Sequence, residues 1–305
     1  MKIVAYFPEN VLSNVGLSAV YPEWTAEKIF DKTGIASRHI ATGDETALGM
    51  AERASQTLLD KEGIDKDAID FLLLCTQSSE YRLPSTSCLL HERLGLPKTA
   101  GALSFDHGCS GFIYGLSLAK GLIAGGMAKN VLLVTAETYT KYIAAEDKST
   151  RTIFGDGAAA TLIDEEVASK IGAFSFGTDG SGAGKLIVRD NKLFMDGPEI
   201  FNFTLDIVPN TMADVLAKNN LAHGDIDLYV FHQANKFMLD TIRKVNGLPR
   251  DKFYVNLETT GNTVSSTIPI ALKQLGDAGR LKTGMKVMLM GFGVGLSWGA
   301  TIITI

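Results

Sequence analysis

The sequence predicts an α/β fold that is built from two similar halves. Short, wholly apolar segments typical of buried parallel strands, such as residues 71–75 and 131–134, alternate with helical patterns. Residues 64–75 are echoed by 221–232, because each copy has Ile-Asp ahead of an apolar strand, and residues 131–134 are echoed by 287–290. Either echo alone could be a chance similarity between buried strands. Their shared offset, close to half the chain length, indicates a duplication.

The predicted boundary between the halves lies in a charged stretch, which gives an N-terminal unit of 1–166 and a C-terminal unit of 167–305. The chain has 305 residues, of which 46% are hydrophobic and 21% charged, so it can bury a full core. Its net charge of −5 gives no reason to expect a nucleic-acid partner.

Three cysteines without paired spacing indicate a reducing compartment, and no cluster of Cys and His predicts a metal site. The apolar run at the N-terminus is too short for a signal peptide. The longest apolar segment, residues 111–128, is interrupted by Lys120 and falls short of a membrane span. These features predict a cytoplasmic protein with no membrane partner.

The sequence predicts helices and strands along both halves of the chain. A strand at residues 2–6 precedes a helix at 22–31, entered at Pro22, and an amphipathic helix at 45–61 that Gly63 caps. After the buried strand at 71–75, a helix runs from Pro84 to Gly95, and a short buried strand at 102–105 leads into a small-residue helix at 111–126. Further strands are predicted at 131–134, 158–163, 228–231 and 287–290, and a further helix at 267–276.

Cys109 falls at a predicted strand-to-helix turn, beside the first helical N–H groups. The helix dipole and these free donors stabilise an anion, which favours a low thiol pKa and a thiolate nucleophile. Gly108 and Gly111 remove side-chain bulk, so a substrate could approach. The alternative is that Cys109 is a small buried hydrophobe, which is the role that we expect for Cys75 and Cys88.

Three features of the C-terminal half add chemistry to this cysteine. His232 follows a predicted strand, where α/β folds place residues that contact ligands. Asn262 precedes a predicted helix, and the glycine-rich turn at 291–295 follows a strand. Each has a structural alternative, namely a satisfied histidine, a helix cap and a tight turn. Together with Cys109 they supply a nucleophile, two groups that can hydrogen-bond an oxyanion, and a backbone hole.

Several short motifs occur in an order that is typical of one enzyme family. They lie at residues 32–40, 84–86, 109–112, 154–158, 232–235, 261–263 and 298–300. With them the sequence resembles the ketoacyl-acyl-carrier-protein synthase III family, of the thiolase-like fold, over essentially the whole chain. The resemblance implies two similar βαβ halves in a five-layer α-β-α-β-α arrangement, and a homodimer.

The resemblance also implies an acyltransferase of fatty acid biosynthesis that works by decarboxylative Claisen condensation. Cys109 resembles the acyl-accepting nucleophile, and His232 and Asn262 resemble the pair that stabilises the enolate of a malonyl thioester. The hole for acyl transfer would use the backbone N–H groups of Cys109 and Val294. The implied substrate-binding residues are Leu83, from the partner subunit, and Phe154, Gly293 and Gly295. No cofactor is expected to be tightly bound, since the substrates arrive as acyl-CoA or phosphopantetheine thioesters.

The sequence departs from the family where relatives hold the coenzyme A nucleotide. Aligned on residues 33–35, the expected Trp and Arg are Lys28 and Ala36, and Trp24 is out of register. A carrier-protein donor is therefore more credible than coenzyme A. A basic patch beside the active-site mouth would suit an acidic acyl carrier protein, although it could equally be a solvated helix face. Its members are Lys236, Arg243, Lys244, Arg250 and Lys252.

Other functions compete with condensation. A specialised relative could move the acyl group to an oxygen, nitrogen or other carbon nucleophile without decarboxylation, with His232 as a general base. A protein that only binds acyl chains or a carrier has no need of Cys109, His232 and Asn262 together. A papain-like hydrolase also uses Cys, His and Asn, but the duplicated α/β pattern does not fit it. Acyl length and pathway are not encoded in any motif of the sequence.

Overall fold

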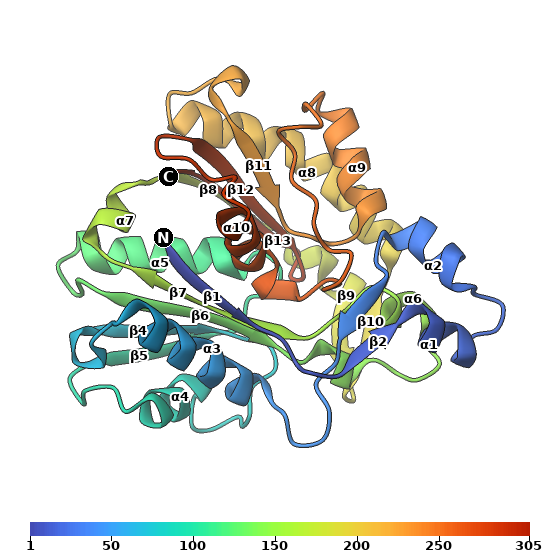
Figure 1. The fold of residues 1–305 in the computed structure, drawn as a ribbon. Helices are drawn as coiled ribbons and strands as arrows, with labels where there is room; N and C mark the ends of the chain where they lie inside the picture. Colours follow the sequence, from blue (N-terminus) through green and yellow to red (C-terminus); the bar gives the residue numbers. More distant parts are fainter.

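Two β-sheets form the framework of the structure, a computed structural model that describes residues 1–305 (Figure 1). The first sheet has the strand order β1-β7-β6-β4-β5 and the second β11-β12-β13-β8. The first comprises β1 (Lys2–Tyr6), β4 (Phe71–Cys75), β5 (Gly101–Phe105), β6 (Val131–Glu137) and β7 (Gly157–Ile163). The second comprises β8 (Ile171–Thr178), β11 (Leu228–Phe231), β12 (Lys286–Gly293) and β13 (Ser297–Thr304). Two small ladders pair β2 (Val11–Ser13) with β3 (Ser37–His39) and β9 (Leu186–Arg189) with β10 (Lys192–Met195).

The two sheets share one arrangement, as the repeated segments predict. β4 pairs in parallel with β6, with Phe71 opposite Val131, and β11 pairs in parallel with β12, with Leu228 opposite Val287. The order β1-β7-β6-β4 therefore matches β8-β13-β12-β11, and the counterpart of β5 is reduced to a single bridge at Phe253. The duplicated architecture is confirmed, whereas the residue at which the halves divide stays a prediction.

Parallel pairing is only part of the architecture, because each βαβ half also has antiparallel strands. β7 runs antiparallel to both β1 and β6, and β13 runs antiparallel to both β12 and β8. β5 is an edge strand with β4 as its only partner, and its Leu103 is 45% exposed. The prediction of a buried strand at 102–105 is therefore wrong, because an edge strand of one chain keeps one side open.

Helices cover both sheets and separate them, which gives the five layers (Figure 1). The central layer is α5 (Gly111–Ala124) and α10 (Thr267–Asp277), whose apolar side chains pack with residues of both sheets. The outer layers are α3 (Ala47–Glu62) and α4 (Thr86–Leu94) on one side and α8 (Gly197–Lys218) and α9 (Lys236–Val245) on the other. A helix that packs between two sheets needs apolar residues on both of the faces that it buries, which explains the largely apolar composition of α5.

The remaining helices are short or lie at the edge of the layers. They are α1 (Asn14–Val20), α2 (Ala26–Thr33), α6 (Lys148–Arg151) and α7 (Glu165–Ser169). The 3₁₀ helices are η1 (Lys66–Ala68), η2 (Tyr139–Tyr142), η3 (Gly180–Lys185), η4 (His223–Asp225) and η5 (Val264–Ser266). None of the helices is long and apolar enough to cross a membrane.

The ends of the helices are set by capping hydrogen bonds rather than by the positions of prolines. The helix predicted to begin at Pro22 begins at Ala26, because the side chain of Thr25 accepts a hydrogen bond from the N–H of Lys28. α1 has no counterpart among the predicted elements, since its few apolar residues show no clear period. The predicted cap at Gly63 is confirmed, with a left-handed φ of 58°.

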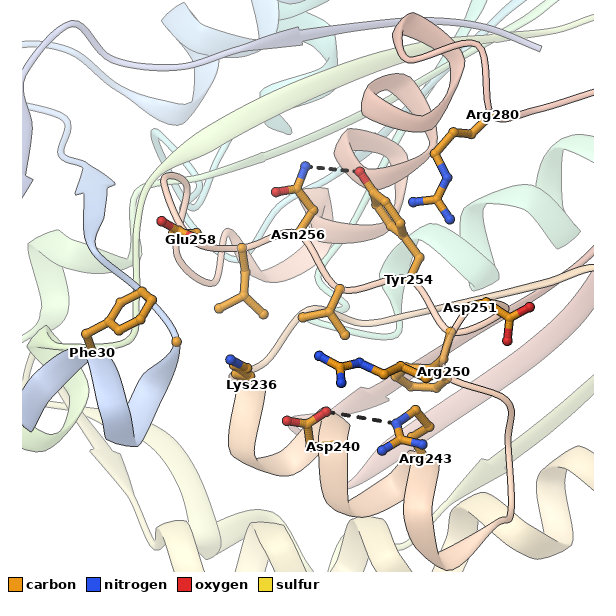
Figure 2. A pocket seen from close by; sticks show the side chains of 14 residues that line it. Phe30, Lys236, Asp240, Arg243, Arg250, Asp251, Tyr254, Asn256, Glu258 and Arg280 are labelled. Carbon is orange, nitrogen blue, oxygen red and sulfur yellow. Dashed lines mark hydrogen bonds and ion pairs between the residues drawn. The ribbon is translucent and has the colours of Figure 1, made fainter.

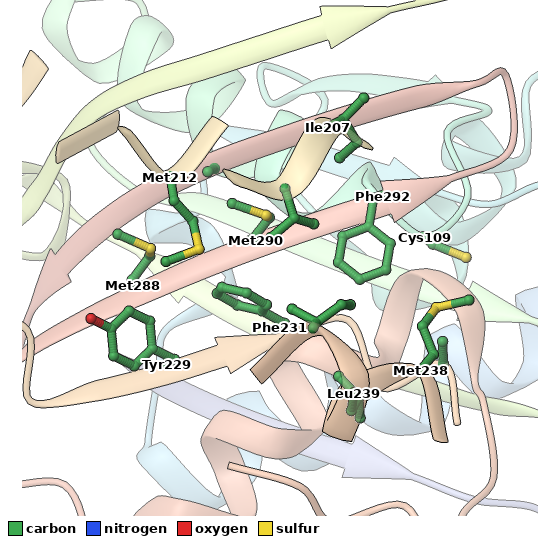
Figure 3. Close-up of a cluster of buried hydrophobic side chains, with 14 of the residues drawn as sticks. Cys109, Ile207, Met212, Tyr229, Phe231, Met238, Leu239, Met288, Met290 and Phe292 are labelled. Atoms are coloured by element: carbon green, nitrogen blue, oxygen red, sulfur yellow. The ribbon is translucent and has the colours of Figure 1, made fainter. Parts of the chain in front are cut away.

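The apolar core of the C-terminal half extends to Cys109 at one end (Figure 3). Met212 and Met288 lie deep in this cluster, while Phe292 lies between them and the cysteine. Burying each such side chain contributes on the order of 1.5–3 kcal/mol to folding. The core therefore forms a rigid wall behind the site of predicted chemistry.

Candidate active site

Cys109 lies between the end of β5 and the start of α5, with Ser110 as the helix N-cap. Its side chain is buried, at 5% exposure. The end of β12 passes directly against it, because a Cβ on Gly293 would lie 2.9 Å from Cys109 Cβ and 3.1 Å from Sγ. Glycine at this position leaves the space in which a substrate can reach the sulfur.

The pKa of this thiol contradicts the expectation drawn from the helix end. Burial, and after it the nearby Glu137 carboxyl, raise the pKa of Cys109 to about 12. Burial also raises the pKa of Glu137 to about 8, although its carboxyl accepts hydrogen bonds from Ser78 and Ser265. Loss of water around the sulfur outweighs the helix dipole, so the resting residue is a thiol at neutral pH. Sequence reasoning missed Glu137, since it ends an otherwise apolar strand.

His232 follows β11 and is held in place by its backbone and by one ring nitrogen. Its backbone N–H donates to the carbonyl of Met290 at 2.8 Å, so it extends the parallel ladder. Its Nδ1 lies 2.7 Å from Oγ1 of Thr267, and its Nε2 lies 3.5 Å from Nδ2 of Asn262. Burial lowers the pKa of His232 to about 3, so the imidazole is neutral at pH 7.

Asn262 is fixed by the N-terminal half of the chain. Its backbone N–H donates to the carbonyl of Ile153 at 2.9 Å, and its carbonyl accepts from the N–H of Gly155 at 3.0 Å. Its side-chain Oδ1 accepts the N–H of Val264 at 2.8 Å. The N-cap of α10 is Ser266, so Asn262 contacts only the first N–H of the short helix η5 ahead of it. Ile153 and Gly155 therefore position the backbone of Asn262, and Val264 orients its side-chain amide.

The structure brings the three predicted catalytic side chains into one enclosure, which we call the central cavity. It has a volume of 110 Å³ and contains Cys109 from the N-terminal half together with His232 and Asn262 from the C-terminal half. Of the predicted substrate-binding residues, Phe154 and Gly293 also line it. The other lining residues are Ile153, Leu186, Met195, Gly197, Ile200, Ala234, Asn235, Met238 and Phe292. Apart from Ala234 and Asn235, which belong to the motif at 232–235, these residues have the pattern of ordinary core residues in the sequence, so they gave no signal.

The two backbone donors of the predicted oxyanion hole lie on loops that touch. Neither the N–H of Cys109 nor that of Val294 donates a hydrogen bond within the protein. A Cβ on Gly108 would lie 2.6 Å from Cγ1 of Val294, so the two turns are in contact. The backbone φ angle of Val294 is not positive, so valine fits at this position without backbone strain. Their joint role in catalysis stays a prediction.

A second hollow, the side cavity, adjoins the central cavity at their shared residue Leu186. It has a volume of 430 Å³, and Val294 and the predicted substrate-binding residue Gly295 line it with Tyr139 and Tyr142. Leu83 lines neither cavity of its own chain, and it is 86% exposed. An apolar side chain exposed to that degree has no partner within one chain.

The basic patch is more mixed than the sequence predicts (Figure 2). Lys236, Arg243 and Arg250 line an outer cavity of 680 Å³ beside α9, and acidic side chains line it as well. Lys244 does not line this cavity. Lys252 does not line it either, and its ammonium donates to the backbone carbonyl of Ile226 at 2.7 Å. The remaining charged residues of the outer cavity are Asp240, Asp251, Glu258 and Arg280.

The surroundings of two further side chains differ from the sequence-based expectation. Cys88, expected in the core, is exposed on α4, while Cys75 is buried as expected. Trp24, set aside as out of register, has three ammonium groups over its ring, those of Lys28 at 5.5 Å, Lys32 at 5.3 Å and Lys148 at 6.0 Å. No group of three His, Cys, Asp or Glu side chains is arranged to hold a metal ion.

Comparisons with known proteins point to one family. Residues 104–180 match the family model for 3-oxoacyl-[acyl-carrier-protein (ACP)] synthase III, and residues 216–305 match the model for its C-terminal part. A β-ketoacyl-[acyl-carrier-protein] synthase III of Clostridium perfringens is 36% identical over 314 residues, which cover 98% of this chain and 96% of the relative. One of Bacillus cereus is 36% identical over 301 residues, covering 98% and 96%.

Solved structures agree with the sequence comparisons. A crystal structure of a 3-oxoacyl-(acyl-carrier-protein) synthase III is 45% identical, with a TM-score of 0.97, and covers 99% of this chain and 98% of its own. The enzyme of Thermus thermophilus is 34% identical, with a TM-score of 0.92 and the same coverage. OleA of Xanthomonas campestris, at 20% identity and a TM-score of 0.90, shares the fold.

Proposed function

This chain belongs to the 3-oxoacyl-[acyl-carrier-protein] synthase III family, and we propose how its residues carry out the decarboxylative condensation of that family. It is an acyltransferase that joins an acyl group to a malonyl-derived unit as a β-ketoacyl thioester. Cys109 holds the acyl group, and His232 and Asn262 bind the enolate oxygen. The observation that carries these roles is that all three side chains, from two halves of the chain, face one cavity of 110 Å³.

In the loading step, the sulfur of Cys109 attacks the carbonyl carbon of an acyl thioester. The carbonyl oxygen becomes an oxyanion, and the unpaired N–H groups of Cys109 and Val294 are available to donate to it. Collapse of the intermediate breaks the bond to the carrier, whose thiol leaves with the proton that Cys109 has lost. The acyl chain then extends from the central cavity toward the side cavity and passes beside Leu186, which lines both.

In the condensing step, a malonyl thioester loses CO₂ and its carbonyl oxygen takes up the charge as an enolate. The enolate carbon attacks the acyl carbonyl, and Cys109 is released as the carbon–carbon bond forms. Neutral donors suit this step, because they strengthen as charge develops and do not trap the carboxylate of the substrate. Asn262 and the neutral His232 provide such donors.

The direct test is to follow both products in one reaction. The protein is loaded with an acyl donor and mixed with a malonyl thioester, and CO₂ and β-ketoacyl thioester are both measured. We expect equal amounts of the two. Acyl transfer to an alcohol or amine without any release of CO₂ would show instead the non-decarboxylating alternative.

The carriers of the two substrates follow from the surface around the site. We assign acyl carrier protein as a partner, with Lys236, Arg243 and Arg250 beside α9 as its basic contacts. Acyl-CoA or phosphopantetheine thioesters serve as substrates, and no tightly bound cofactor takes part. A homodimer would cover Leu83 and the open edge of β5, both of which are exposed in one chain.

The donor prediction concerns the nucleotide of coenzyme A. Because Lys28 and Ala36 replace the stacking and phosphate-binding residues of relatives, we expect kcat/KM for an acyl-CoA to be similar to that for the matching acyl-pantetheine. The ratio of the two values is the measurement. A strong preference for coenzyme A would contradict this prediction and implicate Trp24 and its lysines, in which case Trp24→Ala should remove the preference.

The second prediction here concerns Leu83, which we place in the acyl pocket of the partner subunit. Relatives often have Phe at this position, so the pocket should be deeper by about a ring's worth of atoms, and one or two methylenes shift selectivity by roughly 1–3 kcal/mol. We expect medium-chain or branched acyl groups to be accepted and Leu83→Phe to favour shorter ones. Competition between acyl donors of different length measures the change.

Mixed dimers test whether Leu83 acts across the interface. One subunit carries Leu83→Trp and the other carries Cys109→Ala. The only working Cys109 then belongs to the subunit that carries Leu83→Trp, but its acyl pocket is lined by the unchanged Leu83 of the partner subunit, so long-chain activity should persist. Loss of that activity to the level of the Leu83→Trp homodimer would mean that Leu83 does not act in trans.

A further inference from the structure

His232 has a buried neighbour that the roles above leave unexplained. Its Nδ1 lies 2.7 Å from Oγ1 of Thr267, the first residue of α10, and both side chains are buried. A neutral imidazole carries one proton, on Nδ1 or on Nε2. The partner of one nitrogen decides the state of the other, so Thr267 governs whether Nε2 presents a donor or an acceptor to the central cavity.

The distances around Thr267 decide between these two states. Its hydroxyl has one hydrogen to donate, either to Nδ1 of His232 at 2.7 Å or to the carbonyl of Val264 at 3.1 Å. An O–H donor typically lies about 2.7–2.8 Å from its acceptor and an N–H donor about 2.9–3.0 Å away. The Val264 carbonyl already accepts the backbone N–H of Thr267. The shorter contact is therefore the O–H donor, and the imidazole proton is left on Nε2.

Asn262 supplies a second donor beside the same ring nitrogen. Its Oδ1 accepts the N–H of Val264 at 2.8 Å, so its NH₂ group must face Nε2 of His232, 3.5 Å away. With the ring proton on Nε2, both groups are N–H donors and make no hydrogen bond to each other. A single substrate oxygen within reach of both would accept from each, which is the arrangement that an enolate oxygen requires.

We propose that Thr267 is a positioning residue that holds His232 with its proton on Nε2, so that decarboxylation depends on the Thr267 hydroxyl and loading does not. The part about decarboxylation rests on the proposed function. A ring protonated on Nε2 has no lone pair to offer the central cavity, so His232 is not the base that takes the thiol proton. The Thr267 hydroxyl is therefore needed for the condensing step and not for the loading step.

Three substitutions at Thr267 test the proposal in activity. Thr267→Val removes the donor at nearly constant volume and should lower CO₂ release by about 10²-fold, as for one lost oxyanion donor. Thr267→Ser keeps the hydroxyl and should restore most of the rate. Thr267→Asp offers Nδ1 only an acceptor, so the proton should move to Nδ1 and decarboxylation should fall further. Acyl loading of Cys109, followed by mass spectrometry, should change by less than about threefold in each, since none of them alters the loading donors.

The matched control is Thr211→Val in α8. The hydroxyl of Thr211 is also buried and donates to a backbone carbonyl, that of Ile207 at 2.7 Å, but it does not reach the central cavity. Removing this hydroxyl should leave CO₂ release unchanged. The variant therefore shows how much activity is lost merely because a buried hydroxyl is removed. A Thr267→Val protein that lost loading and decarboxylation equally, or lost neither, would overturn the proposal.

The imidazole itself gives a readout that does not depend on turnover. In protein labelled with ¹⁵N-histidine, the signals absent from His232→Ala identify this ring among the five histidines. Wild type should show a protonated Nε2 and a bare Nδ1, and Thr267→Asp should show the reverse. A wild-type ring protonated on Nδ1 would overturn the assignment. If wild type released no CO₂ from any malonyl thioester, the proposed function would fail while the spectrum still tested the tautomer.

Discussion

Replacing Cys109 by alanine should abolish acyl loading, with no acyl-enzyme detectable by mass spectrometry of the intact protein. The reason is that Cys109 is the only thiol in the central cavity and the only one next to the two unpaired backbone donors. Cys75 is buried away from the cavity, and burial raises its pKa well above the usual range. It should therefore remain unmodified in every variant.

Cys88 is the necessary control, because it is exposed and could exchange slowly with a thioester. Cys88→Ser should load one acyl group per chain at the wild-type rate, and the double variant with Cys109→Ala should load none. Peptide mapping locates the adduct. Acylation of Cys109→Ala at the wild-type stoichiometry would remove Cys109 from the mechanism.

The pH dependence of loading shows whether burial or the helix dipole controls the pKa of Cys109. The pKa of Cys109 is raised to about 12, so the thiolate fraction grows as pH rises toward that value. Loading should accelerate between about pH 6 and 9, by nearly tenfold per unit if the thiolate is the nucleophile. The slope should lessen near pH 8, where the Glu137 carboxyl ionises and opposes a second negative charge. A plateau below pH 8 would indicate that the helix end controls this thiol after all.

The main features of the site were predictable because strand ends carry positional information. His232 was expected at the carboxyl end of an apolar strand, and parallel strands bring such ends to one edge of a sheet. The shared offset of the repeated segments likewise predicted two sheets with matching parallel pairs. Both are local patterns whose consequence in three dimensions follows from β geometry.

Features that depend on packing were not predictable. The pKa of Cys109 could be argued from a visible helix start, but the opposing burial depends on Gly293 and β12, far away in the sequence. Thr267 has the pattern of an ordinary first residue of a helix, and only the approach of β11 gives its hydroxyl a catalytic neighbour. Lys252 belongs to a run of basic residues, yet its ammonium bonds a carbonyl within its own half.

The other large effect expected is on decarboxylation, in His232→Ala and Asn262→Ala. Each removes one of two donors to the same enolate oxygen, so each should slow CO₂ release from a malonyl thioester by about 10²-fold or more, which corresponds to roughly 2.7 kcal/mol. Loading of Cys109 should be much less affected, because its oxyanion faces the backbone N–H groups of Cys109 and Val294. Separate assays of acyl-enzyme formation and CO₂ release measure the two effects.

The double variant sharpens this test. When one donor is gone the enolate oxygen is already poorly held, so the combined loss should be smaller than the product of the single losses. Asn246→Ala is a matched control, since it removes a side-chain bond to the carbonyl of Ile242 at 2.8 Å without touching the central cavity, and it should leave both steps intact. Fully multiplicative losses would show that His232 and Asn262 act on different atoms. Unchanged CO₂ release in either single variant would exclude that residue from binding the enolate, because a donor to the charged oxygen cannot be removed from a water-poor cavity without slowing the step.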